Sequence, residues 1–179
     1  MIKSLVPLYA FMFRGRSNAL LNEIQRRGRL RTAHVQLAND DVRSLLRILG
    51  RNATVWYAPD QADTRSGELL PFFGEPSMTS TATTRLARIS GAAIIPLFSY
   101  RLPDDSGYVL RFCRPLDDLP STDVVRDTAR LTSVLEDFVR ECPDQYFWTH
   151  RKFKGRLGLR DAYGTSKTDR SSSAAKDSS

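Results

Sequence analysis

Apolar residues recur along the chain with spacings that predict several helices. The clearest stripe runs through residues 121–142 at steps of three or four between two prolines, as expected for a long amphipathic helix. Its members are Val124, Thr128, Leu131, Leu135, Phe138 and Cys142. A second stripe over residues 42–49 follows two aspartates and ends at Gly50, which predicts a shorter helix with a cap at each end.

Two more helices are expected from weaker signals. One begins at residues 17–18, where Ser and Asn are good N-caps, and runs into an arginine-rich end. Its apolar face consists of Leu20, Leu21 and Ile24. The other spans residues 79–90, ends at Gly91 and is expected to turn Leu86 and Ile89 inward.

Strands are expected where apolar runs lack a helical period. Residues 5–13 form a strand or buried segment, and residues 53–58 are apolar on both faces, which is typical of an inner strand in a sheet covered by helices. Two more strands, 92–100 and 108–113, flank a turn. Residues 59–78 carry Pro and Gly around an aromatic cluster and are expected to form a long loop.

Composition indicates how many domains the chain can form and which class of partner it binds. Hydrophobic residues make up 41% of the 179 residues, which is enough for one packed domain over residues 1–157. The polar remainder, 158–179, is expected to be a disordered tail. The net charge of +7 is concentrated in residues 14–51 and 151–179 and suggests an anionic partner, which charge alone leaves open among nucleic acid, a membrane surface and a phosphorylated small molecule.

Cysteine spacing and hydropathy argue against zinc-binding, disulfide-bonded and membrane-spanning proteins. Cys113 and Cys142 have no Cys-x-x-Cys spacing, so a zinc site or a paired disulfide is a poor interpretation and a reducing compartment fits better. The longest uninterrupted apolar runs, 5–13 and 92–98, are shorter than the ~20 residues of a spanning helix. No transmembrane segment is therefore expected.

Candidate catalytic and binding groups are few, because the chain has only two histidines. His34 is followed five positions later by Asn39 instead of an acid, and we interpret it as a surface residue. His150 belongs to residues 143–156, where aromatic and basic residues alternate as in a packed helix-to-tail segment, a lipid–water interface or a nucleic-acid site. The arginine cluster at 25–31 is either a solvated helix end or a phosphate clamp.

Four stretches taken together resemble a known family. They are GRLR (28–31), VWYAPDQ (55–61), PFFGEPSMTSTATTRLARISGAAIIP (71–96) and PDQYFWTHRKFKGR (143–156). In this order and spacing they resemble the late acyltransferases of lipid A biosynthesis, within the lysophospholipid acyltransferase superfamily. The resemblance covers about residues 5–156. It implies an α/β fold with a mixed, mostly parallel sheet flanked by helices, and no cofactor or metal.

The resemblance also implies an activity and a location. Such enzymes move a fatty acyl chain from acyl carrier protein to a hydroxyl of a lipid A precursor at the cytoplasmic face of the bacterial inner membrane. Their acid–base element, a His followed after four residues by an acid, and their membrane anchor lie upstream of the segment where this chain begins. We therefore expect an N-terminally truncated chain that is inactive alone, with neither His34 nor His150 as the catalytic base.

Substrate-binding residues are carried over by their local motifs. Arg29, with Arg31 beside it, resembles an arginine expected to hold a phosphate or acyl-donor group. Asp60, just past the strand at 53–58, resembles an acid expected at the edge of the sheet to bind acceptor polar groups or to orient a basic residue across the cleft, although it could instead cap its loop. Thr79, Thr81 and Arg85 are expected to face phosphate near the start of a helix.

Two further groups and two rival functions complete the expectations. Phe72, Phe73 and Gly74 shape a substrate pocket or anchor a loop. The expected membrane or headgroup contacts are Trp148, His150, Arg151, Lys152 and Lys154. The main rival is a non-catalytic peripheral module that binds anionic lipid through residues 14–51 and 151–156. Nucleic-acid binding rests only on charge and aromatic content and is not expected.

Overall fold

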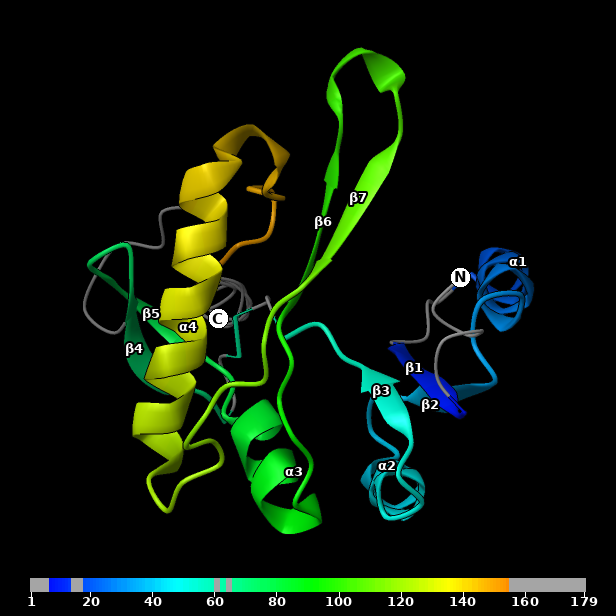
Figure 1. Cartoon of the computed structure of the whole chain (residues 1–179), viewed down its shortest axis with the longest axis horizontal. Coiled ribbons are helices and arrows are strands. Elements are labelled where there is room, and N and C mark those ends of the chain that lie inside the picture. Colours follow the sequence, from blue (N-terminus) through cyan, green and yellow to red (C-terminus); the bar gives the residue numbers. More distant parts are fainter. Residues whose placement is uncertain (1–6, 14–17, 60–61, 64–65, 155–179) are drawn as a thin grey trace, which may run out of the picture. The chain divides into compact units, whose positions relative to one another are not determined.

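The computed structural model describes residues 7–13, 18–59, 62–63 and 66–154. The helices are α1 (Ala19–Leu30), α2 (Val42–Leu49), α3 (Ala82–Ser90) and α4 (Val124–Glu141), with short 3-10 turns η2 (Pro103–Asp105) and η3 (Pro143–Gln145). The strands are β1 (Tyr9–Phe13), β2 (Val35–Ala38), β3 (Thr54–Trp56), β4 (Glu68–Phe72), β5 (Glu75–Thr79), β6 (Leu97–Arg101) and β7 (Tyr108–Phe112) (Figure 1). The expected disordered tail, 158–179, lies outside the described residues.

These elements fall into two compact units. The first contains strands β1, β2 and β3 with helices α1, α2 and α3, and the second contains strands β4 and β5 with most of α4. Strands β6 and β7, which pair with each other, contribute residues to both units. Each unit is described by itself below.

The first unit is built on a parallel sheet with the order β2–β1–β3. Phe11 of β1 lies opposite Gln36 of β2 and Trp56 of β3. The chain passes from β1 through α1 to β2 and then returns through α2 to β3 on the other side of β1. With right-handed crossovers, α1 and α2 therefore cover opposite faces of the sheet (Figure 1). A parallel sheet flanked by helices confirms the expected α/β class.

Successive side chains of β1 point to opposite faces of the sheet. On one face a buried cluster fills the space between the sheet and α2. Its members are Ala10, Met12, Leu37, Leu45 and Ile48. Phe11 and Phe13 point to the other face, which α1 covers. The core of this unit thus depends on the alternation of a single five-residue strand.

Residues 68–79 form an antiparallel hairpin, whereas the sequence predicted a loop. Only Phe73 and Gly74 separate the two strands, and their φ angles of 52° and 78° are those of a type I′ turn, which matches the twist of paired strands. The prediction of a loop was wrong because Pro71 and Pro76 argued against strands. In the hairpin these prolines lie opposite each other, and a two-stranded sheet has only edge strands, which tolerate proline.

The predicted helices are confirmed with small shifts of their ends. Asn18 caps α1 by accepting a hydrogen bond from the Leu21 amide, and Asp41 caps α2 by accepting one from the Ser44 amide. The stripe predicted for α4 is confirmed, since its polar member Thr128 and its aromatic member Phe138 are buried. The paired strands β6 and β7 also confirm the predicted strands at 92–100 and 108–113, although β6 starts later.

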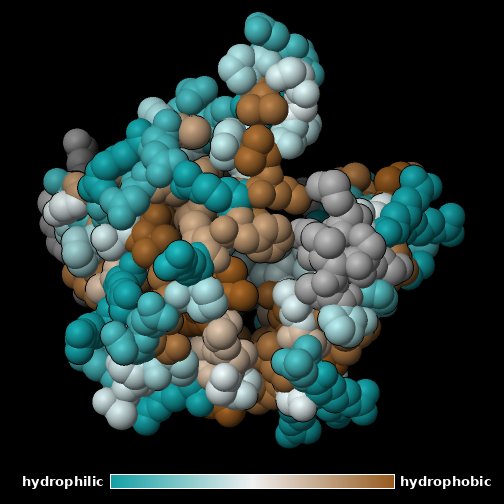
Figure 2. All heavy atoms as spheres, viewed as in Figure 1, coloured by the Kyte–Doolittle hydropathy of each residue, from teal (hydrophilic) through white to brown (hydrophobic). Residues whose placement is uncertain are grey.

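Three details differ from the expectations. The strand at 53–58 is not an inner strand, because β1 occupies the centre and β3 pairs within the described residues with β1 alone. In α3, Leu86 packs on the core as expected, but Ile89 is 69% exposed. The apolar face of α1 is also open, with Leu20 71% exposed. Figure 2 shows apolar side chains, in brown, reaching the surface on the face in view.

The hairpin turn gives a matched pair of glycine substitutions. Gly74→Ala should destabilise the protein by about 1 kcal/mol, because alanine is strained at a φ of 78° although no atom obstructs its Cβ. Gly28→Ala should stabilise it by up to about 1 kcal/mol, because Gly28 lies inside α1 with open space around it. Thermal unfolding of the two variants measures both effects. Equal changes of the same sign would contradict the assigned conformations.

Candidate functional site

The topology of the first unit places a candidate site at the carboxyl edge of its sheet. Strand order reverses between β1 and β3, and in open α/β sheets ligands bind beyond the carboxyl ends of the strands at that point. At this edge β1 ends at Phe13 and β3 ends at Trp56, and the chain continues from β3 through Pro59 to Asp60. Asp60 itself lies outside the described residues, so its expected role stays a prediction.

Arg29 lies on the face of this sheet that α1 covers. Its guanidinium carbon is 5.0 Å from the centroid of the Phe11 ring and 5.6 Å from that of Phe13. The Phe11 ring is itself stacked on Trp56, with centroids 4.4 Å apart and planes 7° from parallel. Two neighbouring aromatic side chains of β1, one of them supported from β3, therefore hold the cation by cation–π contacts.

The other arginines of the cluster at 25–31 are in different environments. Glu23 accepts hydrogen bonds from Arg26 at 2.7 and 2.9 Å and from Arg27 at 2.7 Å. These bonds, from Arg26 first and then Arg27, lower the pKa of Glu23 to about 2. The carboxylate thus neutralises part of this charge, whereas within the described residues no carboxylate pairs with Arg29. A cation–π contact leaves the charge and the N–H edges of a guanidinium available to an anion.

The remaining predicted substrate residues of this unit are exposed. Arg31 is the C-cap of α1, where its amide bonds to the carbonyl oxygens of Arg29 and Gly28. Arg85 points outward from α3, next to the buried Thr84. The structure therefore holds Arg29 in a defined aromatic environment and leaves Arg31 and Arg85 on the surface.

His34 is part of the sheet's framework. Its Nδ1 accepts a hydrogen bond of 3.0 Å from the Tyr9 amide, and its own amide donates to the Tyr9 carbonyl oxygen at 2.8 Å. In a neutral imidazole bound in this way, the proton is on Nε2. The ring thus links the starts of β1 and β2. Its Nδ1 lone pair already accepts the Tyr9 amide hydrogen, so it is not available to take a proton from a substrate.

A hollow of about 370 Å³ separates the second half of α1 from the start of β2. Its lining residues are Phe13, Arg26, Leu30, His34, Val35 and Gln36. The Gln36 side chain donates from Nε2 to the Arg26 carbonyl oxygen at 2.6 Å. Its Oε1 is buried and has no donor within the part of the chain that the structure describes. Such an acceptor costs about 1–3 kcal/mol unless water or a ligand supplies a donor.

In the second unit, two groups of predicted residues form one aromatic cluster. Phe72 is fully buried and packs against Phe73, Tyr146 and Phe153, with ring centroids 4.8 to 6.1 Å apart. Phe73 also faces Trp148 at 6.4 Å. The hairpin tip at Phe73 and Gly74 is thus tied to the segment at 146–153. This burial favours the anchoring role of Phe72 over a place in a substrate pocket.

The predicted membrane contacts divide into buried and exposed side chains. Lys152 is only 3% exposed and its ammonium lies 5.4 Å from the centroid of Phe72, so its burial does not support the expected headgroup contact. Trp148 is half exposed, while Arg151 and Lys154 are on the surface. His150 is half-buried with its ring edge-on to Phe147 at 4.6 Å. No helix within the described ranges has the length and hydropathy to cross a bilayer.

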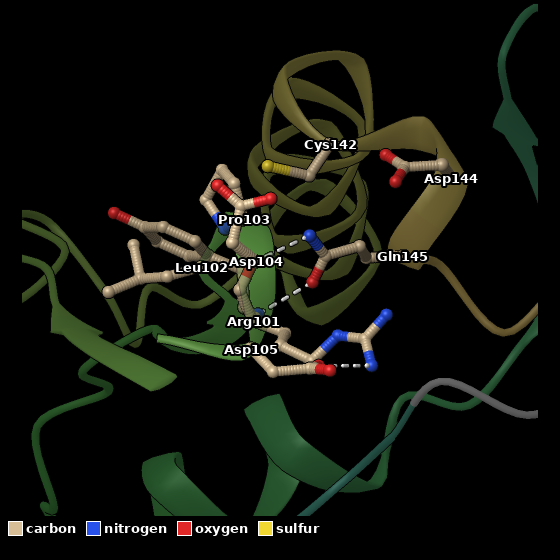
Figure 3. Close-up of a pocket in the computed structure, with 9 residues that line it drawn as sticks. Arg101, Leu102, Pro103, Asp104, Asp105, Cys142, Asp144 and Gln145 are labelled. Carbon is tan, nitrogen blue, oxygen red and sulfur yellow. Dashed lines mark hydrogen bonds and ion pairs between the residues drawn. The ribbon is translucent and has the colours of Figure 1, made fainter. Parts of the chain in front are cut away.

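A second hollow, of about 610 Å³, lies in the second unit between η2 and the end of α4. Figure 3 shows the Gln145 amide facing the backbone of Arg101, to which it is joined by hydrogen bonds of 2.7 and 3.0 Å. The Arg101 side chain is paired with Asp105 at 3.2 Å. None of the predicted site residues lines this hollow, and its polar groups join the end of β6 to η3.

Comparison with known proteins identifies the family. Residues 1–155 match the family described as bacterial lipid A biosynthesis acyltransferase. This chain belongs to that family. Among curated relatives, the lipid A biosynthesis lauroyltransferase of Escherichia coli K12 is 36% identical over 147 residues, which are 81% of this chain and 48% of the relative. The palmitoleoyltransferase of the same strain is 34% identical over 146 residues, 80% of this chain and 47% of the relative.

A third curated relative, named for a different acyl group, also matches this chain. The lipid A biosynthesis myristoyltransferase of Escherichia coli K12 is 28% identical over 154 residues, 82% of this chain and 46% of that protein. The chain spans about half the length of the curated relatives that it matches. The resemblance found in the sequence is thereby confirmed for the family, while the roles of individual residues stay predictions.

The lipid A acyltransferase motifs did not indicate the aromatic residues that hold Arg29. The sequence pattern places Phe11, Phe13 and Trp56 only in apolar strands. The one available signal was the alternation of aromatic residues at positions 9, 11 and 13, which places three rings on one face of a strand. It could not show which helix residue would lie over them, because 16 positions separate Phe13 from Arg29.

The role of His34 can be tested by comparing two substitutions. His34→Ala should destabilise the protein by about 1 kcal/mol, because the Tyr9 amide loses its acceptor. His34→Asn should recover most of that loss, since the asparagine oxygen is an acceptor that reaches a similar position. Chemical denaturation measures both changes. Identical stabilities of the Ala and Asn variants would contradict the framework role.

Proposed function

We propose that this chain acts in the transfer of a fatty acyl group from acyl carrier protein to a hydroxyl of a lipid A precursor. Its own contribution is to bind the phosphorylated glycolipid at the carboxyl edge of the parallel sheet. Arg29 is the principal anion-binding group, with Arg31, Arg85 and Asp60 as further polar contacts. Family membership supports the reaction class, and the names of the relatives support lipid A as the acceptor.

The observation that carries the proposal is the environment of Arg29. The guanidinium is held over Phe11 and Phe13 but is not neutralised by any carboxylate of the described residues. Arginine binds phosphate oxygens through two parallel N–H donors, and it does so best when its rotamer is fixed beforehand. Neighbouring Arg26 and Arg27 share Glu23 and are therefore weaker candidates.

The 179 residues do not supply an evident general base for the acceptor hydroxyl. Neither histidine is followed five positions later by Asp or Glu, since Asn39 and Gly155 occupy those positions. The Nδ1 atom of His34 is in use as a backbone acceptor. The proposal therefore includes the absence of turnover by residues 1–179 alone, because proton removal by a positioned base contributes about 10²–10⁴-fold to such reactions.

The second unit is proposed to contact an anionic membrane surface, at the cytoplasmic face of the inner membrane where the family's substrate would be met. Phe147 is 61% exposed beside the half-exposed Trp148, and Arg151 and Lys154 are on the surface of the same segment. Aromatic rings at headgroup depth and cations near lipid phosphates are a favourable combination. The same surface would serve a non-catalytic lipid-binding module, so activity and binding need separate tests.

A chimera tests the catalytic proposal. Residues 1–155 replace the matching half of the Escherichia coli lauroyltransferase, and acyl transfer from acyl carrier protein to a tetraacylated lipid A precursor is measured. The chimera should be active, and Arg29→Gln should lower kcat/KM at least about tenfold through the loss of a charge-assisted hydrogen bond to phosphate. Arg27→Gln, which removes the same charge from the same helix, should have little effect.

Two results would contradict this account. Equal activity of the Arg29→Gln and parent chimeras would remove Arg29 from the site. Robust turnover by residues 1–179 alone would show that the chain contains its own base. Circular dichroism of each variant establishes that lost activity does not reflect lost folding.

Liposome sedimentation tests the membrane contact. Residues 1–179 should sediment with vesicles that contain anionic lipid and be released by high salt, because the headgroup attraction is screened. Phe147→Ser should weaken binding several-fold, whereas Tyr108→Ser, which also removes an exposed aromatic ring from the second unit, should not. Equal binding of both variants would contradict a contact through residues 147–154.

A further inference from the structure

Helix α2 presents a row of arginines on its exposed side. Arg43 and Arg47 are exposed and one turn apart, opposite Leu45 and Ile48, which fill the core. Arg51 follows four residues later, in the turn after the helix, and is also exposed. Positions four residues apart on a helix are separated by about 6 Å along its axis. The row therefore forms a line of positive charge with a regular spacing.

Other helices pair their arginines with a carboxylate one turn away, whereas α2 does not. Glu23 on α1 pairs with Arg26 and Arg27, and Glu136 on α4 pairs with Arg140. Helix α2 contains no Asp or Glu, and among the described residues no carboxylate forms an ion pair with its arginines. Like charges four residues apart weakly destabilise a helix. A partner that supplies carboxylates would remove this repulsion.

Two carboxylates precede the row without neutralising it. Asp41 is the N-cap of α2, and the hydrogen bonds that it accepts from Ser44 lower its pKa. Attraction to Arg47 makes the smallest contribution to that shift, so these two groups interact only weakly. Asp40, one position earlier, is exposed. The three arginines remain in excess over these two acids.

Helix α3 adds a basic and an apolar contact beside the row. Its Leu86 packs on the core that α2 covers, and the two helices are in contact, so they lie side by side on one face of the sheet. On the exposed side of α3, Arg88 donates a hydrogen bond of 3.3 Å to the Thr122 carbonyl oxygen and keeps its charge. Ile89 beside it is 69% exposed. Apolar surface next to polar and charged groups matches the composition of protein interfaces.

We propose that this face of α2 and α3 docks an acidic helix of a partner protein. Carboxylates one turn apart on the partner pair in succession with Arg43, Arg47 and Arg51, and Ile89 is an apolar contact at the side. A helix fits because its i and i+4 positions repeat at the spacing of the row. Lipid headgroups and nucleic acid fit less well, because neither α2 nor α3 contains an aromatic residue for interfacial or base-stacking contacts. The proposal does not rest on the proposed function, since it uses none of the residues assigned there to the substrate.

Fluorescence anisotropy with designed peptides tests the proposal on residues 1–179. The probe is a labelled, alanine-based helical peptide with glutamates at three successive i, i+4 positions. A peptide of the same composition, with its glutamates spread around the helix, is the control. The aligned peptide should bind about tenfold more tightly, because three exposed ion pairs each contribute modestly and form together only in the aligned arrangement. High salt should remove the difference.

Arg43→Glu separates docking from folding, because its effects on the two have opposite signs. A glutamate in the first turn of α2 favours the helix and pairs with Arg47 four residues later, so the Tm should stay the same or rise. The preference for the aligned peptide should disappear, because the row loses one cation and a second becomes paired. Arg126→Glu, which makes the same change of charge in the first turn of α4, should preserve the preference.

Three outcomes would overturn the proposal. Equal affinity for the two peptides, a comparison that needs no variant, would mean that the net charge of +7 alone accounts for binding. Equal losses of binding in Arg43→Glu and Arg126→Glu would place the contact elsewhere. If Arg43→Glu reduced sedimentation with anionic vesicles, or binding of duplex DNA, as much as binding of the peptide, the surface would belong to lipid or nucleic acid instead.

Discussion

The alternation of side chains along β1 is the constraint on which the first unit depends. Because the strand is central and parallel to both neighbours, its even positions must fill the core against α2, and its odd positions must face α1. Ala10 is completely buried on the first face, while Phe11 and Phe13 present ring faces to Arg29 on the second. A shift by one residue would exchange these roles and lose both the core and the cation's position.

This arrangement is the physical basis of the selective anion binding proposed for the arginine-rich end of α1. Arginines paired with a carboxylate must give up that partner before they bind phosphate, whereas a guanidinium that rests on aromatic rings keeps its charge and most of its donors. Glu23 therefore divides the cluster by environment: it pairs with Arg26 and Arg27, whereas within the described residues no carboxylate pairs with Arg29, the proposed anion-binding group. The aromatic cluster of the second unit uses the same contact differently, since Lys152 is buried over Phe72.

Local patterns predicted the elements better than they predicted the contacts between them. The period of α4 and the caps of α1 and α2 depend on residues a few positions apart, which a sequence displays directly. The hairpin of β4 and β5 was missed because Pro71 and Pro76 outweighed its Phe-Gly turn, although two residues with positive φ are a hairpin signal. The burial of Lys152 and the rings beneath Arg29 depend on tertiary packing, which single-sequence patterns do not contain.

The central claim is that Phe11 and Phe13 hold Arg29 as an open anion-binding group. Side-chain NMR of the arginine Nε–Hε groups tests it most directly, with assignment by Arg29→Gln. The account predicts that the Arg29 signal lies upfield from ring currents, returns toward the usual arginine position in Phe11→Leu, and moves on addition of a tetraacylated lipid A precursor while Arg27 does not. An Arg29 signal at the ordinary position that is unaffected by either change would contradict it.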